Sequence, residues 1–324
     1  MKGIFVGVML SLSPAFANAF PSAVDRAEAL AFPVPARELE IAPVASEPEG
    51  LSSLAVTDRK SDAKFKVYFD AASSQVAQQS IPILAAFYRE IASLVVFEPA
   101  KVEWAPVLFA RNAEVLVLTR KPGETLWKID VAADGRLSPD GVKTLYQVIP
   151  HEQVHSTQHI GHTNIVGLPR WFSEGQATWA GLLITQRWTP ELARETRAKR
   201  TAAFASAKLP LALVKWGGFQ PKLEAILRQL TPDQRAQYEK DPSTVSLSGA
   251  FTFEENDYTQ DESNTLARYG ASLALFDRID KQAGREALLV WFKAVQQAGK
   301  QVTSEQLAAL ALQHTKIDIA AELK

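Results

Sequence analysis

The sequence of 324 residues contains no cysteine. This absence excludes a disulfide framework, a lipid-modified cysteine and a metal site with thiolate ligands. The folded chain must therefore be stabilised by packing, and any metal site in it must use histidine and carboxylate ligands. Histidine is also scarce, with five residues, which leaves few candidates for such a site.

A surplus of one charge is absent as well, since 35 basic residues face 36 acidic ones and the formal net charge is -1. No general basic field exists that would attract nucleic acid or an anionic membrane surface, so we expect no nucleic-acid partner. No apolar run reaches the roughly 20 residues that a membrane span needs, so we expect no integral span. With 47% hydrophobic and 22% charged residues, the composition is that of a globular chain.

The first nineteen residues have the layout of a secretory signal peptide. Lys2 precedes an apolar run over residues 4–12, and small residues follow at Ala17 and Ala19. We therefore expect residues 1–19 to direct export and to be removed, which would place the mature protein in the periplasm or outside the cell.

Residues 20–62 are rich in alanine, proline, serine and charged side chains and show no sustained apolar period. This pattern predicts a flexible leader or linker, with a removable pro-segment as the alternative. The folded part is then expected to begin near residue 63.

From residue 63 the pattern changes, and we predict an α+β fold in two parts. Residues 63–139 should form a small α/β subdomain, with alternating apolar residues for strands and a helical apolar period over 80–95. Its strands are predicted at 65–69, 107–110, 114–119 and 126–132. Residues 140–324 should form a mainly helical subdomain. Its helices are predicted at 140–160, 169–187, 190–206, 219–230, 263–282, 285–298 and 303–314, with a long loop at 241–264.

The chemistry of the chain centres on the sequence His151-Glu152-Gln153-Val154-His155. On a helix, side chains four residues apart project from one face, so both imidazoles can meet one zinc ion. Glu152 lies beside that face and can reach a water molecule without being a ligand, as a general base requires. With five histidines in the chain, a random H-E-x-x-H is expected about half a percent of the time.

A catalytic zinc ion needs a third protein ligand and a fourth position for water. The metzincin pattern would require a glycine and a third histidine three and six residues after His155, but Gln158 and Gly161 occupy these places. His159 and His162 are out of register with that pattern, so neither is a candidate ligand.

Glu174 is the better third ligand, nineteen residues after His155 and within the tract LPRWFSEGQATW at 168–179. Pro169 can open a helix at its first position, and residues 161–167 give enough loop for that helix to fold back antiparallel onto the first. Two helices joined by a short loop would then supply three ligands.

These two segments resemble those of the gluzincin metallopeptidases, typified by thermolysin and the aminopeptidase N group, in which an H-E-x-x-H helix precedes a Glu-bearing helix. The tract WFSEGQAT is similar to the version in aminopeptidase N relatives, collagenases and many bacterial peptidases. The resemblance covers about thirty residues. It implies a zincin-like helical subdomain and one zinc ion held by His151, His155 and Glu174, with Glu152 as the base. It also implies that Thr178 contacts a ligand from behind.

Two departures from the family pattern bear on specificity and on the oxyanion. The G-A-M-E-N stretch that recognises a free substrate N-terminus in the aminopeptidase group is missing upstream of His151, which argues against aminopeptidase specificity. Family members often supply a downstream tyrosine three residues before a glycine, whereas Tyr269 here adjoins Gly270. On a helix this offset rotates the ring by about 200°. Tyr258 is the rival candidate, and a purely structural role for either tyrosine stays open.

Pro150 directly precedes the first histidine, and a proline inside a helix removes a backbone hydrogen bond and clashes with the preceding turn. We therefore expect the helix to kink or to restart at this point. A restart would place His151 in the first turn and keep both histidines on one face.

The sequence thus predicts an exported zinc metallopeptidase that hydrolyses peptides or proteins by direct attack of water. Two other interpretations stay open. One is a catalytically weak or inactive zincin-fold protein that binds a peptide or an envelope partner, and the other is a structural helical protein whose histidines are solvated or packed. The presence of Glu152 favours catalysis over binding.

Overall fold

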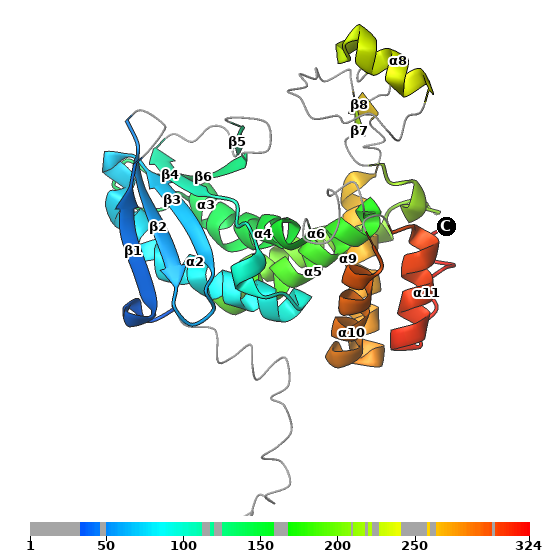
Figure 1. The fold of residues 1–324 in the computed structure, drawn as a ribbon. Helices are drawn as coiled ribbons and strands as arrows, with labels where there is room; N and C mark the ends of the chain where they lie inside the picture. The colour runs from blue at the N-terminus through cyan, green and yellow to red at the C-terminus, as the bar shows by residue number, and fades with distance from the viewer. Residues whose placement is uncertain are drawn as a thin grey trace, which may run out of the picture.

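The computed structural model describes residues 33–45, 50–111, 117–119, 125–158, 168–208, 210–217, 220–221, 227–240, 258–259, 264–299 and 302–324. Within them, a mixed sheet in the N-terminal half is followed by a mainly helical region, which confirms the predicted α+β class (Figure 1). The predicted signal peptide at 1–19 lies outside the described residues, and so do His159 and His162.

The sheet has six strands in the order β1-β2-β3-β4-β6-β5. β1, β2 and β3 pair antiparallel, β4 pairs parallel with β3 and β6, and β5 pairs antiparallel with β6 at the edge. The predicted strands correspond to β3 to β6 within the described residues. The strands are β1 Leu39–Val44, β2 Ser52–Asp58, β3 Lys64–Phe69, β4 Val107–Arg111, β5 Val117–Thr119 and β6 Thr125–Val131.

The first two strands lie inside the stretch predicted as a flexible leader, so that prediction is wrong for β1 and β2. Each residue of β1 pairs with one of β2, and β2 pairs in the same way with β3. β1 is an edge strand in which only Leu39 is buried, and it therefore carries no apolar alternation. Its order comes from backbone pairing with its neighbour, which composition and periodicity do not report.

Helix α2, Ser74–Val95, packs against one face of the sheet and closes the hydrophobic core. Phe65 and Val67 of β3 belong to the same buried cluster as Ile81, Leu84 and Ile91 of the helix. This cluster continues into the helices of the C-terminal half, so one core joins the two predicted subdomains.

The C-terminal half contains the expected helices, with two differences. The helix predicted at 219–230 is wrong at its start, because Gln220–Pro221 form β7, which pairs with β8 at Tyr258–Thr259. Helix α8 buries none of its residues and so has no apolar period to predict it. The helices are α3 Pro139–Lys143, α4 Ile149–Gln158, α5 Arg170–Trp188, α6 Pro190–Ala205, α8 Pro232–Lys240, α9 Thr265–Ala283, α10 Arg285–Gln297 and α11 Ser304–Thr315.

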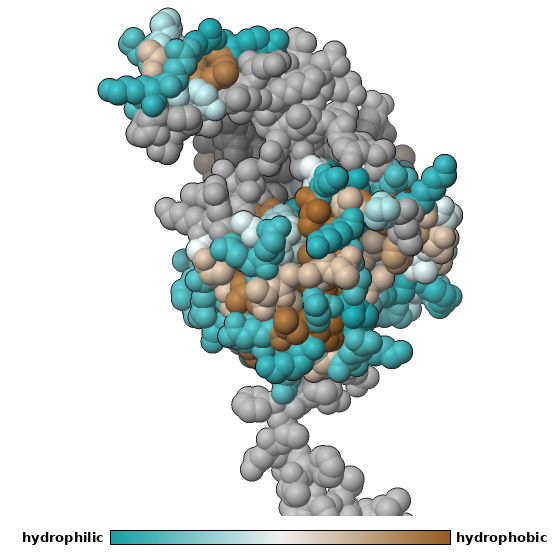
Figure 2. All heavy atoms as spheres, turned by 90° about the vertical axis from the view of Figure 1, so that its right-hand side faces the viewer, coloured by the Kyte–Doolittle hydropathy of each residue, from teal (hydrophilic) through white to brown (hydrophobic). Residues whose placement is uncertain are grey.

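The surface of the described part is that of an ordinary globular protein. None of its helices combines the length and the apolar character that a membrane crossing requires. The face of the molecule shown in Figure 2 mixes hydrophilic and hydrophobic side chains. Val290 on α10 and Leu312 on α11 are about half exposed, and scattered apolar residues of this kind are normal on protein surfaces.

Candidate metal centre

Helices α4 and α5 pack directly against each other and bring the two motif segments together (Figure 1). Gly181 on α5 permits the close approach, because a Cβ atom there would lie 3.0 Å from the backbone nitrogen of His151. A larger residue would press on the start of α4. The two predicted helices are therefore present and in contact.

The chain enters α4 through a π-helical turn, Thr144–Val148, so Pro150 lies in the first turn of α4. A proline has no N–H to offer the carbonyl four residues earlier, here that of Tyr146. The hydroxyl of Thr185 on α5 lies 2.8 Å from this carbonyl oxygen and donates to it. The expected disturbance thus takes the form of a change from π-helix to α-helix just before Pro150.

His151, His155 and Glu174 form the one group of potential metal ligands within the described residues, and their ligand atoms lie within 4.8 Å of one another. Glu174 Oε2 is 3.3 Å from His151 Nε2 and 3.6 Å from His155 Nε2. Ligand atoms about 2.1 Å from one tetrahedral zinc ion are about 3.4 Å apart, so this donor set fits zinc. The structure therefore brings the three predicted ligands to one point.

Glu152 lies beside this group without belonging to it. Its Oε1 is 4.0 Å from His151 Nε2, and its side chain keeps 23% of its surface exposed. The carboxylate is thus near the ligand atoms and still open to water. A carboxylate in this place can exchange protons with a water molecule at the site.

Gln158 orients His155 from behind. Its Oε1 lies 2.8 Å from His155 Nδ1, while its Nε2 donates to the Ser173 carbonyl and to Gln176 Oε1. An acceptor at Nδ1 places one imidazole proton there, so that in the neutral imidazole the Nε2 lone pair would be available to a metal ion. Sequence reasoning missed this role, although the spacing of three residues along α4 was an available signal.

The contact implied for Thr178 is not made among the described residues. Thr178 Oγ1 and His151 Nδ1 are both buried, and neither has a hydrogen-bond partner in the described part of the chain. His151 is therefore held by its place in the helix and by its contact with Glu174. His155 differs because Gln158 contacts its second ring nitrogen.

Tyr269 on α9 reaches the site. Its hydroxyl donates to Glu174 Oε2 at 2.8 Å, and its ring centroid lies 6.2 Å from that of His151. The altered spacing to the following glycine does not keep the ring away, because α9 packs on α5. For the rival Tyr258, the structure describes the backbone in β8 and not the side chain.

Two arginines near Glu174 were not predicted. Arg170 Nε lies 3.8 Å from Glu174 Oε1, and Arg170 Nη1 donates to the Gly217 carbonyl at 2.6 Å. The guanidinium carbon of Arg200 lies 5.1 Å from the centroid of the Tyr269 ring. The spacing of four residues between Arg170 and Glu174 is a sequence signal, whereas no pattern connects Arg200 to the site.

The charged groups of the centre stabilise one another. Burial alone would raise the pKa of Glu174, but hydrogen bonds from His151 and His155 and their charge hold it well below its usual range. Burial alone would lower the pKa of His155, but its contact with Glu174 and the charges of Glu174 and Glu152 raise it to about 9. The metal-free chain thus keeps an ionised carboxylate facing the imidazoles.

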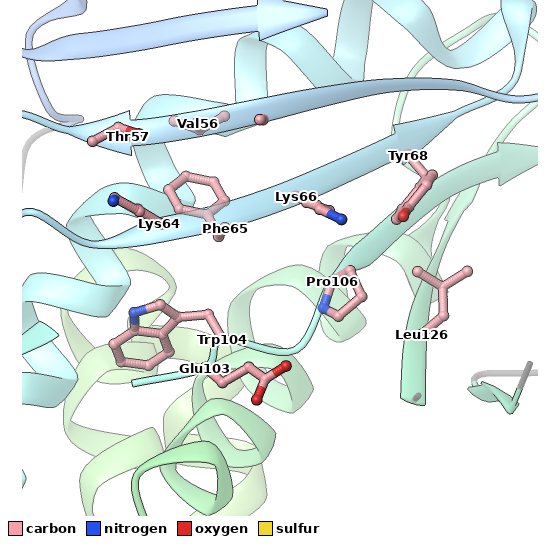
Figure 3. A pocket seen from close by; sticks show the side chains of 11 residues that line it. Val56, Thr57, Lys64, Phe65, Lys66, Tyr68, Glu103, Trp104, Pro106 and Leu126 are labelled. Carbon is pink, nitrogen blue, oxygen red and sulfur yellow. The ribbon is translucent and has the colours of Figure 1, made fainter. Parts of the chain in front are cut away.

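A separate cavity of about 300 Å³ lies on the sheet (Figure 3). Lys64 and Lys66 of β3 line it together with Glu103 and Trp104 from the segment before β4. Its lining shares no residue with the metal centre and includes no histidine.

Comparison with models of protein families and with curated proteins finds no match for this chain. The functional assignment therefore depends on the geometry and chemistry of the metal centre.

Proposed function

We propose that the protein is an exported, zinc-dependent metallopeptidase of the gluzincin kind. The observation that carries the proposal is the meeting of His151, His155 and Glu174, from two helices, with Glu152 beside them. Two imidazoles and one carboxylate leave a fourth coordination position open, which is the donor set of a catalytic zinc site rather than a structural one.

Glu152 is the base in this proposal. Zinc, when bound, would polarise the carbonyl of the scissile peptide bond and lower the pKa of a water molecule bound to the metal. Glu152 would accept the proton that the attacking water loses and deliver it to the leaving amine nitrogen. Water attacks the carbonyl carbon directly and the C–N bond breaks, so no acyl-enzyme forms.

Tyr269 is placed to stabilise the oxygen that gains negative charge during the attack. Burial, together with the negative charge of Glu174, raises the pKa of Tyr269, so its hydroxyl keeps the proton that it would donate. In the substrate-free chain this hydroxyl donates to Glu174 Oε2. A small movement of the ring would transfer the hydrogen bond to substrate.

The edge of the sheet at β5, which pairs with no further strand among the described residues, offers a place for an extended substrate. β5 ends the strand order, and its neighbour β6 contacts the π-helical turn that leads into α4. Pairing of a peptide with this edge would use backbone hydrogen bonds, which give affinity with little sequence preference. Peptides or unfolded protein segments are therefore the proposed substrates.

The test compares the purified mature chain with its Glu152→Gln variant. We expect about one zinc ion per chain in both, measured by elemental analysis, and hydrolysis of a mixed peptide library slower by about 10²- to 10⁴-fold in the variant. Glu286→Gln, which changes an exposed carboxylate on α10, is the matched control and should keep full activity.

Two results would contradict the proposal. A wild-type chain that binds no zinc would remove its basis. A chain that binds zinc and cleaves no peptide of the library would instead support a zincin-fold protein that binds its partner without cleaving it.

A further inference from the structure

Arg200 lies on α6 beside the ring of Tyr269. Gly270 on α9 makes this possible, because a Cβ atom there would lie 2.3 Å from the carbonyl oxygen of Arg200. The two helices therefore approach closely at this level, and the guanidinium carbon of Arg200 lies 5.1 Å from the ring centroid of Tyr269. The hydroxyl of the same ring reaches Glu174, so Arg200 is one side chain away from the metal centre.

Among the described residues, no carboxylate forms an ion pair with Arg200. Its guanidinium is half-buried and has neither a hydrogen bond nor an ion pair with any residue that the structure describes. The other arginines on α6 differ, since Arg197 pairs with Asp277 and Arg194 pairs with Glu191.

A half-buried guanidinium that contacts an aromatic ring but forms no ion pair among the described residues is unusual, because burying a charge costs free energy unless it is paired. Burial lowers the pKa of the Arg200 guanidinium, and the electrostatic influence of Tyr269 and Glu174 opposes this effect. Glu174 itself is already engaged by His151 and His155. The free-energy cost of burying the Arg200 charge would be offset if a bound anion paired with the guanidinium.

Arg170, the other arginine nearby, does not offer the same opportunity. Its side chain contacts Glu174 and donates to the Gly217 carbonyl, and it stacks on Trp216 with its guanidinium carbon 5.0 Å from the ring centroid. Of the two described arginines near the centre, Arg200 is therefore the one that keeps its hydrogen-bonding capacity for a ligand.

We propose that Arg200 binds a carboxylate of the peptide substrate, and so makes the enzyme selective for peptides that present a carboxylate next to the scissile bond. The planar guanidinium can donate two parallel hydrogen bonds to a carboxylate, a geometry that lysine cannot reproduce. The carboxylate has two sources, the free C-terminus of the substrate or an Asp or Glu side chain. This inference depends on the proposed peptidase function for its biological meaning, although the binding itself does not require catalysis.

The experiment measures peptide binding by calorimetry to the zinc-loaded Glu152→Gln chain, which cannot consume the ligand. Three peptides of one sequence are compared: one with a free C-terminal carboxylate, one with a C-terminal amide, and one amidated peptide with an added internal glutamate. We expect the free acid, the glutamate peptide or both to bind about tenfold more tightly than the neutral amide. Which of the two is favoured identifies the source of the carboxylate.

The Arg200→Gln substitution in the same background should bring this tenfold preference below about twofold. Arg200→Lys should keep only part of the preference, because lysine retains the positive charge but cannot donate two parallel hydrogen bonds to a carboxylate. Arg194→Gln is the matched control, since it removes an exposed arginine from the same helix and should leave the preference intact. Circular dichroism of each variant checks that the helical content and the thermal unfolding of the chain are unchanged.

Equal binding of the three peptides to the chain with Arg200 intact would overturn the inference, and so would a preference that survives Arg200→Gln. The proposed function is tested separately by zinc-dependent hydrolysis. Hydrolysis without a carboxylate preference removes the role of Arg200 and leaves the peptidase, whereas a preference that depends on Arg200, in a chain that cleaves nothing, removes the peptidase.

Discussion

The two ends of α5 each take part in a buried carboxylate centre, and the two centres differ in their partners. Near its start, Glu174 meets His151 and His155 from α4. Near its end, Arg187 meets Glu90 from α2, with 2.6 Å between Arg187 Nη1 and Glu90 Oε2. Both carboxylates are removed from water, and they respond in opposite ways.

Burial raises the pKa of Glu90 to about 7, because the charge of Arg187 and the hydrogen bond from Trp188 offset it only in part. At Glu174 the imidazoles outweigh burial and hold the pKa below its usual range. A guanidinium has no lone pair to offer a metal, whereas a neutral imidazole has one. The Glu90 centre therefore joins α2 to α5, and the Glu174 centre is the one suited to a metal ion.

The largest expected effect is the loss of zinc when a histidine of the Glu174 centre is removed. His155→Ala should reduce zinc from about one ion per chain to below about a tenth, because two protein ligands hold the ion poorly. The measurement is elemental analysis after gel filtration. His314→Ala, which removes a histidine on α11 outside the cluster, should keep the metal. A zinc-loaded His155→Ala chain would show that the ion binds elsewhere.

The second prediction concerns the pH dependence of stability at the Glu90 centre. The pKa of Glu90 in the folded chain, about 7, lies above its ordinary value of 4.5, so the folded chain holds this proton more tightly than the unfolded one. The stabilising contribution is fully present below pH 4.5 and is lost as the pH rises through 7. The difference in unfolding free energy between wild type and Glu90→Gln should fall by about 3 kcal/mol over this window.

Urea unfolding of the metal-free chains at several pH values measures this difference. Glu174 has a lowered pKa, so it stabilises the folded chain at higher pH and loses this effect on acidification, opposite to Glu90. Because both chains contain Glu174, subtracting the Glu90→Gln curve from the wild-type curve removes its contribution. A difference that stays flat would mean that Glu90 keeps the pKa of an exposed carboxylate in the folded chain, and a difference that rises with pH would mean that its ion pair with Arg187 lowers the pKa.

The smallest expected effect tests the support behind His155. Gln158→Ala should keep one zinc ion per chain but weaken its binding by about 10- to 100-fold, because the imidazole loses the acceptor that sets its tautomer and orientation. Competition with a chromophoric chelator measures the affinity. Gln313→Ala, at an exposed position on α11, is the matched control. An unchanged affinity would show that packing alone orients His155.

The candidate ligand set was predictable because it depends on local spacing. Two histidines four residues apart share a helix face in any sequence that is helical there, and a glutamate on the next helix completes the set once that helix packs back. Strand β3 was predictable for a related reason, since Phe65, Val67 and Phe69 alternate along it and are buried. The edge strand β1 was not, because it is ordered by pairing and has only Leu39 buried.

The surroundings of the ligands were decided by tertiary structure. Tyr269 reaches Glu174 because α9 packs on α5, despite a sequence spacing that argued against it. Arg200 lies over that ring because Gly270 lets α6 approach α9.

By itself, the sequence determined a cysteine-free α+β chain with three potential metal ligands and a carboxylate beside them. Which further side chains surround those ligands was decided only by the tertiary structure. The physical reason is that spacing along one helix is a local property, whereas the approach of one helix to another depends on every side chain between them.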